Sequence, residues 1–64
     1  MTLKLYYGKQ VTVVCDNNQT FSGVVDDYFF PEDNDSGEES IILKTTDSEF
    51  IEFIASEINE IKIN

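Results

Sequence analysis

The residues best able to do chemistry in this 64-residue chain are its carboxylates, its aromatic residues and one cysteine. Asp26 and Asp27 are adjacent, and paired acids can share a proton or hold a metal ion. Consecutive strand residues point to opposite faces, however, so these carboxylates cannot converge on one substrate atom. Cys15 has no histidine anywhere in the chain to activate it, and it shares a strand face with Val11 and Val13, which is typical of a buried thiol. We therefore expect no catalytic residue, no cofactor and no enzyme activity.

Residues 31–40, PEDNDSGEES, form an acidic loop that holds five carboxylates between residues 32 and 39. These acids could attract calcium, but Leu43 falls where a twelve-residue calcium loop needs a bidentate glutamate. Without histidine and with a single cysteine, the chain lacks the ligands of a structural zinc site. The sequence favours a solvated loop and no dedicated metal site. A weak surface site for a divalent ion is the alternative.

Three consecutive aromatic residues precede the acidic loop. Because strand residues alternate between faces, the three cannot all point inward, and at least one should be exposed. An exposed aromatic ring beside an acidic loop suits a protein partner better than RNA. The candidate interaction surface predicted from the sequence therefore consists of Tyr28, Phe29, Phe30, Asp33, Asp35, Glu38 and Glu39.

The net charge of the chain limits the classes of partner that it is expected to bind. Thirteen acidic residues against four basic ones give a formal net charge of −9, and arginine is absent. Nucleic-acid affinity depends largely on lysine and arginine at the phosphates, so nucleic acid is not an expected ligand. Anionic membrane surfaces would repel the chain, and no apolar run reaches the roughly 20 residues of a membrane span. We expect a cytoplasmic protein that binds a protein partner or a second copy of itself.

The carboxylates of the acidic loop have no lysine or arginine within the loop to pair with. They are expected to repel one another, most strongly at low salt. Neutralising Asp33, Asp35, Glu38 and Glu39 together as amides is therefore expected to raise the melting temperature.

Alternating apolar and polar residues predict a series of short strands. Residues 9–15 place Val11, Val13 and Cys15 on one face, which is the period of two of a half-buried strand. Asn17 and Asn18 can adopt the positive φ angles of a tight hairpin turn. By the same pattern, further strands are predicted over residues 20–30, 40–46, 49–55 and 60–63.

The C-terminal segment allows two interpretations. Its isoleucines at positions 51, 54, 58 and 61 fit helical spacing, so one amphipathic helix over residues 49–63 is an alternative. Five isoleucines and two phenylalanines in this segment favour strands. The strand interpretation places a single tight turn over residues 56–59 and turns Ile61 and Ile63 inward.

The second strand changes its apolar phase along its length. Phe21, Gly23 and Val25 share one face, whereas Tyr28 and Phe30 have the opposite parity. Such a slip beside a glycine predicts a bent or bulged strand. Five short antiparallel strands in so short a chain predict an all-β fold, a closed or nearly closed small barrel that hides its sheet edges.

These segments resemble the Sm-like (LSm) family, whose bent five-stranded barrel carries two short motifs. The first has an aromatic residue, a glycine, an aliphatic residue and a second aromatic residue, matched here by Phe21, Gly23, Val25 and Tyr28. In the second, aliphatic residues are matched by Ile54, Ile58 and Ile61. The resemblance spans residues 9–63. It implies one strongly bent antiparallel SH3-like or Sm-like barrel domain over residues 1–64.

The residues with which that family contacts RNA are not retained. Phe29 stands where the family has an aspartate, and Asp33 or Asn34 stands where it has an asparagine. Ala55 and Ser56 replace its pair of a basic residue and a glycine. The resemblance therefore implies the barrel without the RNA pocket.

The sequence as a whole predicts a non-enzymatic Sm-like barrel that acts as a protein–protein interaction or assembly module, with homo-oligomerisation as one form. Two alternatives stay open. One is a divergent RNA- or DNA-binding barrel with a rebuilt ligand site, and the other is an acidic inhibitor of a basic partner. The net charge disfavours the nucleic-acid binder.

Overall fold

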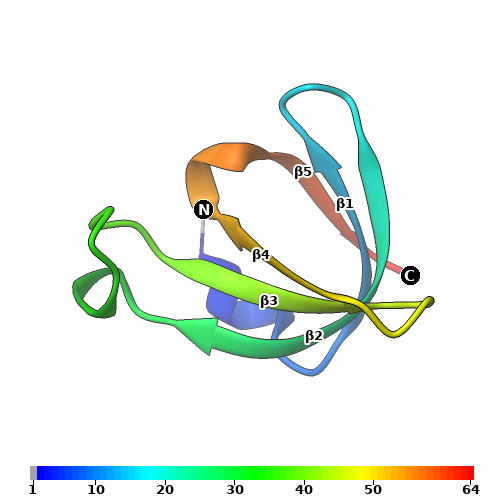
Figure 1. Ribbon diagram of the computed structural model, residues 1–64, viewed down its shortest axis with the longest axis horizontal. Helices are drawn as coiled ribbons and strands as arrows, with labels where there is room; N and C mark the ends of the chain where they lie inside the picture. Colours follow the sequence, from blue (N-terminus) through cyan, green and yellow to red (C-terminus); the bar gives the residue numbers. More distant parts are fainter. Residues whose placement is uncertain (1) are drawn as a thin grey trace.

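Five antiparallel strands form one sheet in the order β4-β3-β2-β1-β5 in the computed structural model, which describes residues 2–64. The sheet is strongly bent and curls on itself (Figure 1). The strands are β1 (Gln10–Cys15), β2 (Thr20–Phe29), β3 (Ser40–Thr45), β4 (Phe50–Ile54) and β5 (Ile58–Ile63). There are also three short 3-10 helices: η1 (Leu3–Tyr6) precedes β1, η2 (Pro31–Asp33) lies between β2 and β3, and η3 (Ala55–Glu57) lies between β4 and β5. The predicted all-β fold of five antiparallel strands is confirmed, and the alternative of a helix over residues 49–63 is wrong.

The core collects the inward-facing residues of all five strands and one residue of η1. Val11, Val13 and Cys15 alternate along β1 and are all buried, as their spacing predicts. Leu3 of η1 is completely buried, so the N-terminal segment covers part of this core. The buried apolar residues are Leu3, Val11, Val13, Cys15, Val25, Ile41, Leu43, Phe53 and Ile58.

Strand β2 bends where its apolar phase slips. Its pairing with β3 shifts register between Val25 and Asp27, so Asp26 is the extra residue of a bulge. The bulge turns Tyr28 back onto the core, against which its ring packs. Three residues before Asp26, Gly23 lies so close to β3 that a Cβ there would meet the backbone of Lys44 and Thr45. The bent strand predicted from the sequence is confirmed.

Ile63 lies on the inward side of the sheet, as predicted, but it is not buried. Ile61 is half-buried and packs against the core, whereas Ile63 is 59% exposed. Ile63 pairs with the buried Val11, so both side chains point to the same side of the sheet. Because β5 is an edge strand, no element among residues 2–64 covers Ile63 on its outer side.

The 3-10 helices are the longest helical elements that residues 2–64 contain. None of them has the length or the apolar character to cross a membrane.

Candidate interaction surface around the acidic loop

The acidic loop leads from β2 to β3 and extends to one side of the sheet (Figure 1). The structure divides the predicted surface into three groups by exposure. Phe30, Asp33 and Asp35 are exposed, and Tyr28, Phe29 and Glu38 are half-buried. Glu39 is buried, with 9% of its surface exposed.

Glu39 is a structural residue rather than part of the exposed surface. Its Oε1 accepts hydrogen bonds from the backbone N–H of Leu3 and from the hydroxyl of Tyr28, both at 2.9 Å. The carboxylate thereby joins η1, the end of β2 and the start of β3. Burial, followed by the hydrogen bond to Glu39 and its charge, raises the pKa of the Tyr28 hydroxyl. The sequence placed Glu39 among solvated carboxylates because a loop position gave no sign of these two distant donors.

Glu38 ties the acidic loop to η3. Its Oε1 accepts the backbone N–H of Ser56 at 2.9 Å, and its Oε2 accepts the Ser56 hydroxyl at 3.1 Å. Asn34 reinforces the loop by donating from Nδ2 to the Glu38 carbonyl at 2.7 Å and to Ser40 Oγ at 3.0 Å. The Ser40 hydroxyl donates in turn to Glu52 of β4 at 2.9 Å. The prediction of a merely solvated loop is therefore wrong for Glu38 and Glu39.

The contact between Glu38 and Ser56 also bears on anion binding. A backbone N–H and a hydroxyl are the kind of donors that hold a phosphate group. Here both donors of Ser56 already serve a carboxylate of the same chain. In residues 2–64, no three side chains of histidine, cysteine, aspartate or glutamate lie close enough together to hold a metal ion.

The two groups of loop carboxylates should respond oppositely to neutralisation. Asp33 and Asp35 are exposed and make no side-chain hydrogen bond or ion pair within residues 2–64. Asp33→Asn with Asp35→Asn should raise the melting temperature at low salt by about 2–4 °C, equivalent to about 0.5 kcal/mol of relieved repulsion. High salt should abolish this gain because it screens exposed charges.

Glu38→Gln is the matched comparison, since it also removes loop charge. It should lower the melting temperature at every salt concentration, because a neutral amide accepts weaker hydrogen bonds from Ser56 than a carboxylate does. Thermal unfolding followed by circular dichroism at low and high salt measures both variants. A gain in stability from Glu38→Gln would show that its bonds to Ser56 contribute nothing.

Beside the acidic loop lies an open pocket with a volume of ≈ 340 Å³, lined mainly by aromatic side chains. The rings of Tyr28 and Phe30 meet edge to face, with centroids 5.2 Å apart. Lys4 Nζ lies 5.1 Å from the centroid of the Phe30 ring, within cation–π range. Tyr7 and Asp27 complete the lining.

Sequence reasoning found part of this pocket and missed the rest. Tyr28 and Phe30 were predicted surface residues, and the structure brings them together. Lys4 and Tyr7 are supplied by η1 and the turn that follows it. The sequence carried one signal for these two residues, an aromatic and a basic residue close together near the N-terminus. Only the packing of η1 against β2 brings them to Tyr28 and Phe30.

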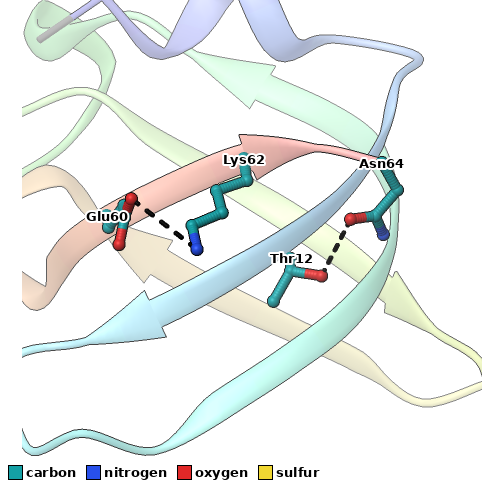
Figure 2. A network of polar contacts seen from close by, with 4 residues as sticks. All are labelled: Thr12, Glu60, Lys62 and Asn64. Carbon is teal, nitrogen blue, oxygen red and sulfur yellow. Dashed lines mark hydrogen bonds and ion pairs between the residues drawn. The ribbon is translucent and has the colours of Figure 1, made fainter.

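The two edge strands, β4 and β5, offer two further candidate contact sites. Within residues 2–64 the outer sides of β4 and β5 pair with no other strand. Figure 2 shows polar contacts on β5 and its neighbour β1. Thr12 of β1 donates from Oγ1 to Oδ1 of Asn64, just after β5, at 3.0 Å, and Lys62 Nζ lies 3.9 Å from Glu60 Oε2. This ion pair is exposed and contributes little to stability. Each edge strand also carries an exposed apolar side chain, Ile63 on β5 and Phe50 on β4.

No protein-family model matches the chain, and no curated protein matches it in sequence. Among solved structures, it is similar to a chain from a study of how Edc3 and Scd6 activate the Dcp1:Dcp2 mRNA decapping complex. The two chains are 22% identical, and the TM-score is 0.69. The match covers 98% of this chain and 59% of that chain. This likeness is one of fold, and the fold is a small, bent, antiparallel β-sheet domain.

Proposed function

We propose that this protein is a non-enzymatic Sm-like barrel that works as a protein–protein assembly module, pairing its edge strands with those of another copy. The observation that carries the proposal is the pair of open sheet edges, β4 and β5, at opposite ends of the strand order. An open edge presents unpaired backbone donors and acceptors to a partner strand. In the Sm-like family, rings form by pairing of the fourth strand of one subunit with the fifth of the next.

The hydrogen-bond pattern identifies the free backbone groups. In antiparallel pairs, hydrogen-bonded and non-hydrogen-bonded positions alternate. On β4, the bond from Thr45 N–H to Glu49 O fixes the phase and leaves the backbone of Phe50 and Glu52 facing outward. On β5, the bond from Asn64 N–H to Gln10 O leaves that of Ile61 and Ile63 facing outward. No proline interrupts either strand.

Other features support the Sm-like assignment. Strand β2 is bulged at Asp26, three residues after Gly23, and Phe21 and Tyr28 of the same motif pack against the core. Ile54 and Ile58 of the second motif flank the short turn η3 between the last two strands. The chain of similar fold comes from a multi-protein complex, which supports a role in protein contacts.

Solution mass tests the proposal. We expect light scattering at physiological salt to give a mass of two or more chains, each of 7.3 kDa. The multimer should weaken at low salt because subunits with a net charge of −9 repel one another. A monomer of 7.3 kDa at every concentration and salt level would reject assembly through the edges.

Ile63→Pro is the variant that tests the edge itself. Proline removes the outward N–H of Ile63 while leaving the inward bonds of β5 to β1 in place. We expect the multimer to dissociate while the far-ultraviolet circular dichroism of the folded sheet persists. Ile63→Thr is the matched control, because it removes the same apolar side chain but keeps the N–H, and it should retain more of the multimer. Equal loss in both variants would assign the contact to the side chain instead of the strand edge.

A further inference from the structure

We infer that the aromatic pocket formed by Tyr7, Tyr28 and Phe30 with Asp27 binds a lysine or arginine side chain from a basic segment of a partner protein. This site lies apart from the edge strands, so the inference stands independently of assembly through them. Three aromatic rings and one carboxylate around an open pocket are the groups that recognise an organic cation.

The geometry of the pocket favours a single long side chain. Its volume of ≈ 340 Å³ lies at the lower end of the range of ligand pockets, roughly 300–1,000 Å³. Tyr28 is held in place by its hydroxyl bond to Glu39, and Asp27 Oδ1 is positioned by the Tyr28 N–H at 2.8 Å. Two walls of the pocket are therefore fixed before any ligand arrives, which lowers the ordering cost of binding.

The chain itself supplies a cation to this site. Lys4 Nζ lies over the Phe30 ring at 5.1 Å, so an ammonium group is accommodated there without a partner. Lys4 is an exposed residue, and a flexible exposed side chain can be displaced. We therefore assign Lys4 as an internal competitor of the incoming cation.

The surrounding charge selects a basic partner. Asp27 lines the pocket, and the charge of Glu32 also acts on Tyr28. The protein as a whole carries −9, which steers cationic segments toward it and repels polyanions such as RNA. A neutral apolar anchor would gain nothing from these carboxylates. Charge complementarity thus points to lysine or arginine as the occupant.

The experiment is an NMR titration of the full chain with three short peptides at physiological salt. All three share one glycine–serine frame with capped ends, and each carries two central residues of lysine, arginine or norleucine. We expect saturable shifts at Tyr7, Asp27 and Phe30 with the two cationic peptides only. Equal binding of the norleucine peptide would overturn the inference by showing a purely apolar site. Saturable binding of oligo-uridine in the same pocket would also overturn it.

Variants test whether the cationic peptides bind in the pocket or are only attracted by the net negative charge of the protein. Phe30→Leu should weaken binding of the lysine peptide about two- to fivefold, the effect of one exposed cation–π contact. Lys4→Ala should strengthen binding by a similar factor, because it removes the internal competitor.

The matched controls are Phe50→Leu and Lys44→Ala. Lys44 Nζ lies 5.9 Å from the Phe50 ring centroid, so this pair repeats the cation–π contact outside the pocket. Neither control should reproduce the effect of its pocket counterpart. If Lys44→Ala strengthens binding as much as Lys4→Ala, net charge accounts for the result and the pocket assignment fails. It fails equally if Phe30→Leu leaves the affinity unchanged.

Discussion

Replacing Gly23 with alanine is expected to remove a large part of the free energy of unfolding. A Cβ at this position would overlap the carbonyl oxygen of Lys44 and approach both Lys44 C and Thr45 Cα to 2.8 Å. These are backbone atoms of the paired strand β3, so relief requires β2 and β3 to separate where they pair. We expect a loss of about 4 kcal/mol, at the high end for a single substitution. A domain of this size has a total stability of roughly 3–10 kcal/mol.

Gly8→Ala is the control for this prediction. Gly8 adopts a positive φ of 77°, but a Cβ there would meet nothing within 4 Å. Its cost is limited to the left-handed backbone, about 1–2 kcal/mol. Urea unfolding followed by circular dichroism measures both variants. Equal urea midpoints for Gly23→Ala and Gly8→Ala would show that β2 and β3 can separate at Gly23 at little cost in free energy.

Glu39→Ala is expected to destabilise the fold by about 3 kcal/mol. The substitution removes the shared acceptor of two hydrogen bonds, one from the Leu3 N–H and one from the Tyr28 hydroxyl. Leu3 is fully buried, so its N–H would be left without a partner away from water. Losing hydrogen bonds to a charged group costs about 1.5–3 kcal/mol each, and partial rehydration lowers the sum. We expect η1 to detach first, which hydrogen exchange at Leu3 and its neighbours would detect.

Glu39→Gln separates the acceptor from its charge. The amide oxygen can still accept both hydrogen bonds, so most of the stability should remain. The pKa of the Tyr28 hydroxyl should fall toward its ordinary value, because the negative charge of Glu39 is one of the causes that raise it. A raised pKa means that the folded state holds this proton more tightly than the unfolded state. That stabilisation is present below the ordinary pKa of about 10 and is lost as the pH rises through the raised value.

Alkaline titration of the tyrosines by ultraviolet absorbance, with stability measured over the same pH range, tests whether stability falls as Tyr28 loses its proton. The Gln variant should lose less stability than the wild type at alkaline pH. A Glu39→Gln variant as unstable as Glu39→Ala would show that the charge, rather than the acceptor oxygen, holds η1 in place.

The sequence determined the strands, because each strand is a local pattern. Val11, Val13 and Cys15 alternate within one strand, and burial follows from their spacing. The phase slip between Val25 and Tyr28 required a bulge, and the structure has it at Asp26. An exposed aromatic residue was predictable for the same reason, since three consecutive rings cannot share one face. Phe30 is that residue, with 44% of its surface exposed.

The tertiary structure decided what the charged residues do. Glu38 and Glu39 are neighbours in one acidic loop, yet one clamps Ser56, 18 residues away, and the other holds Leu3, 36 residues away. No local pattern encodes such pairings. From the sequence a loop carboxylate is expected to be solvated, and only the fold shows whether a distant donor reaches it. The aromatic pocket has the same origin, since Lys4 joins Phe30 only when η1 packs against β2. Hydrophobic periodicity is written along the chain, whereas a polar site depends on which distant groups the packed core leaves within hydrogen-bond reach.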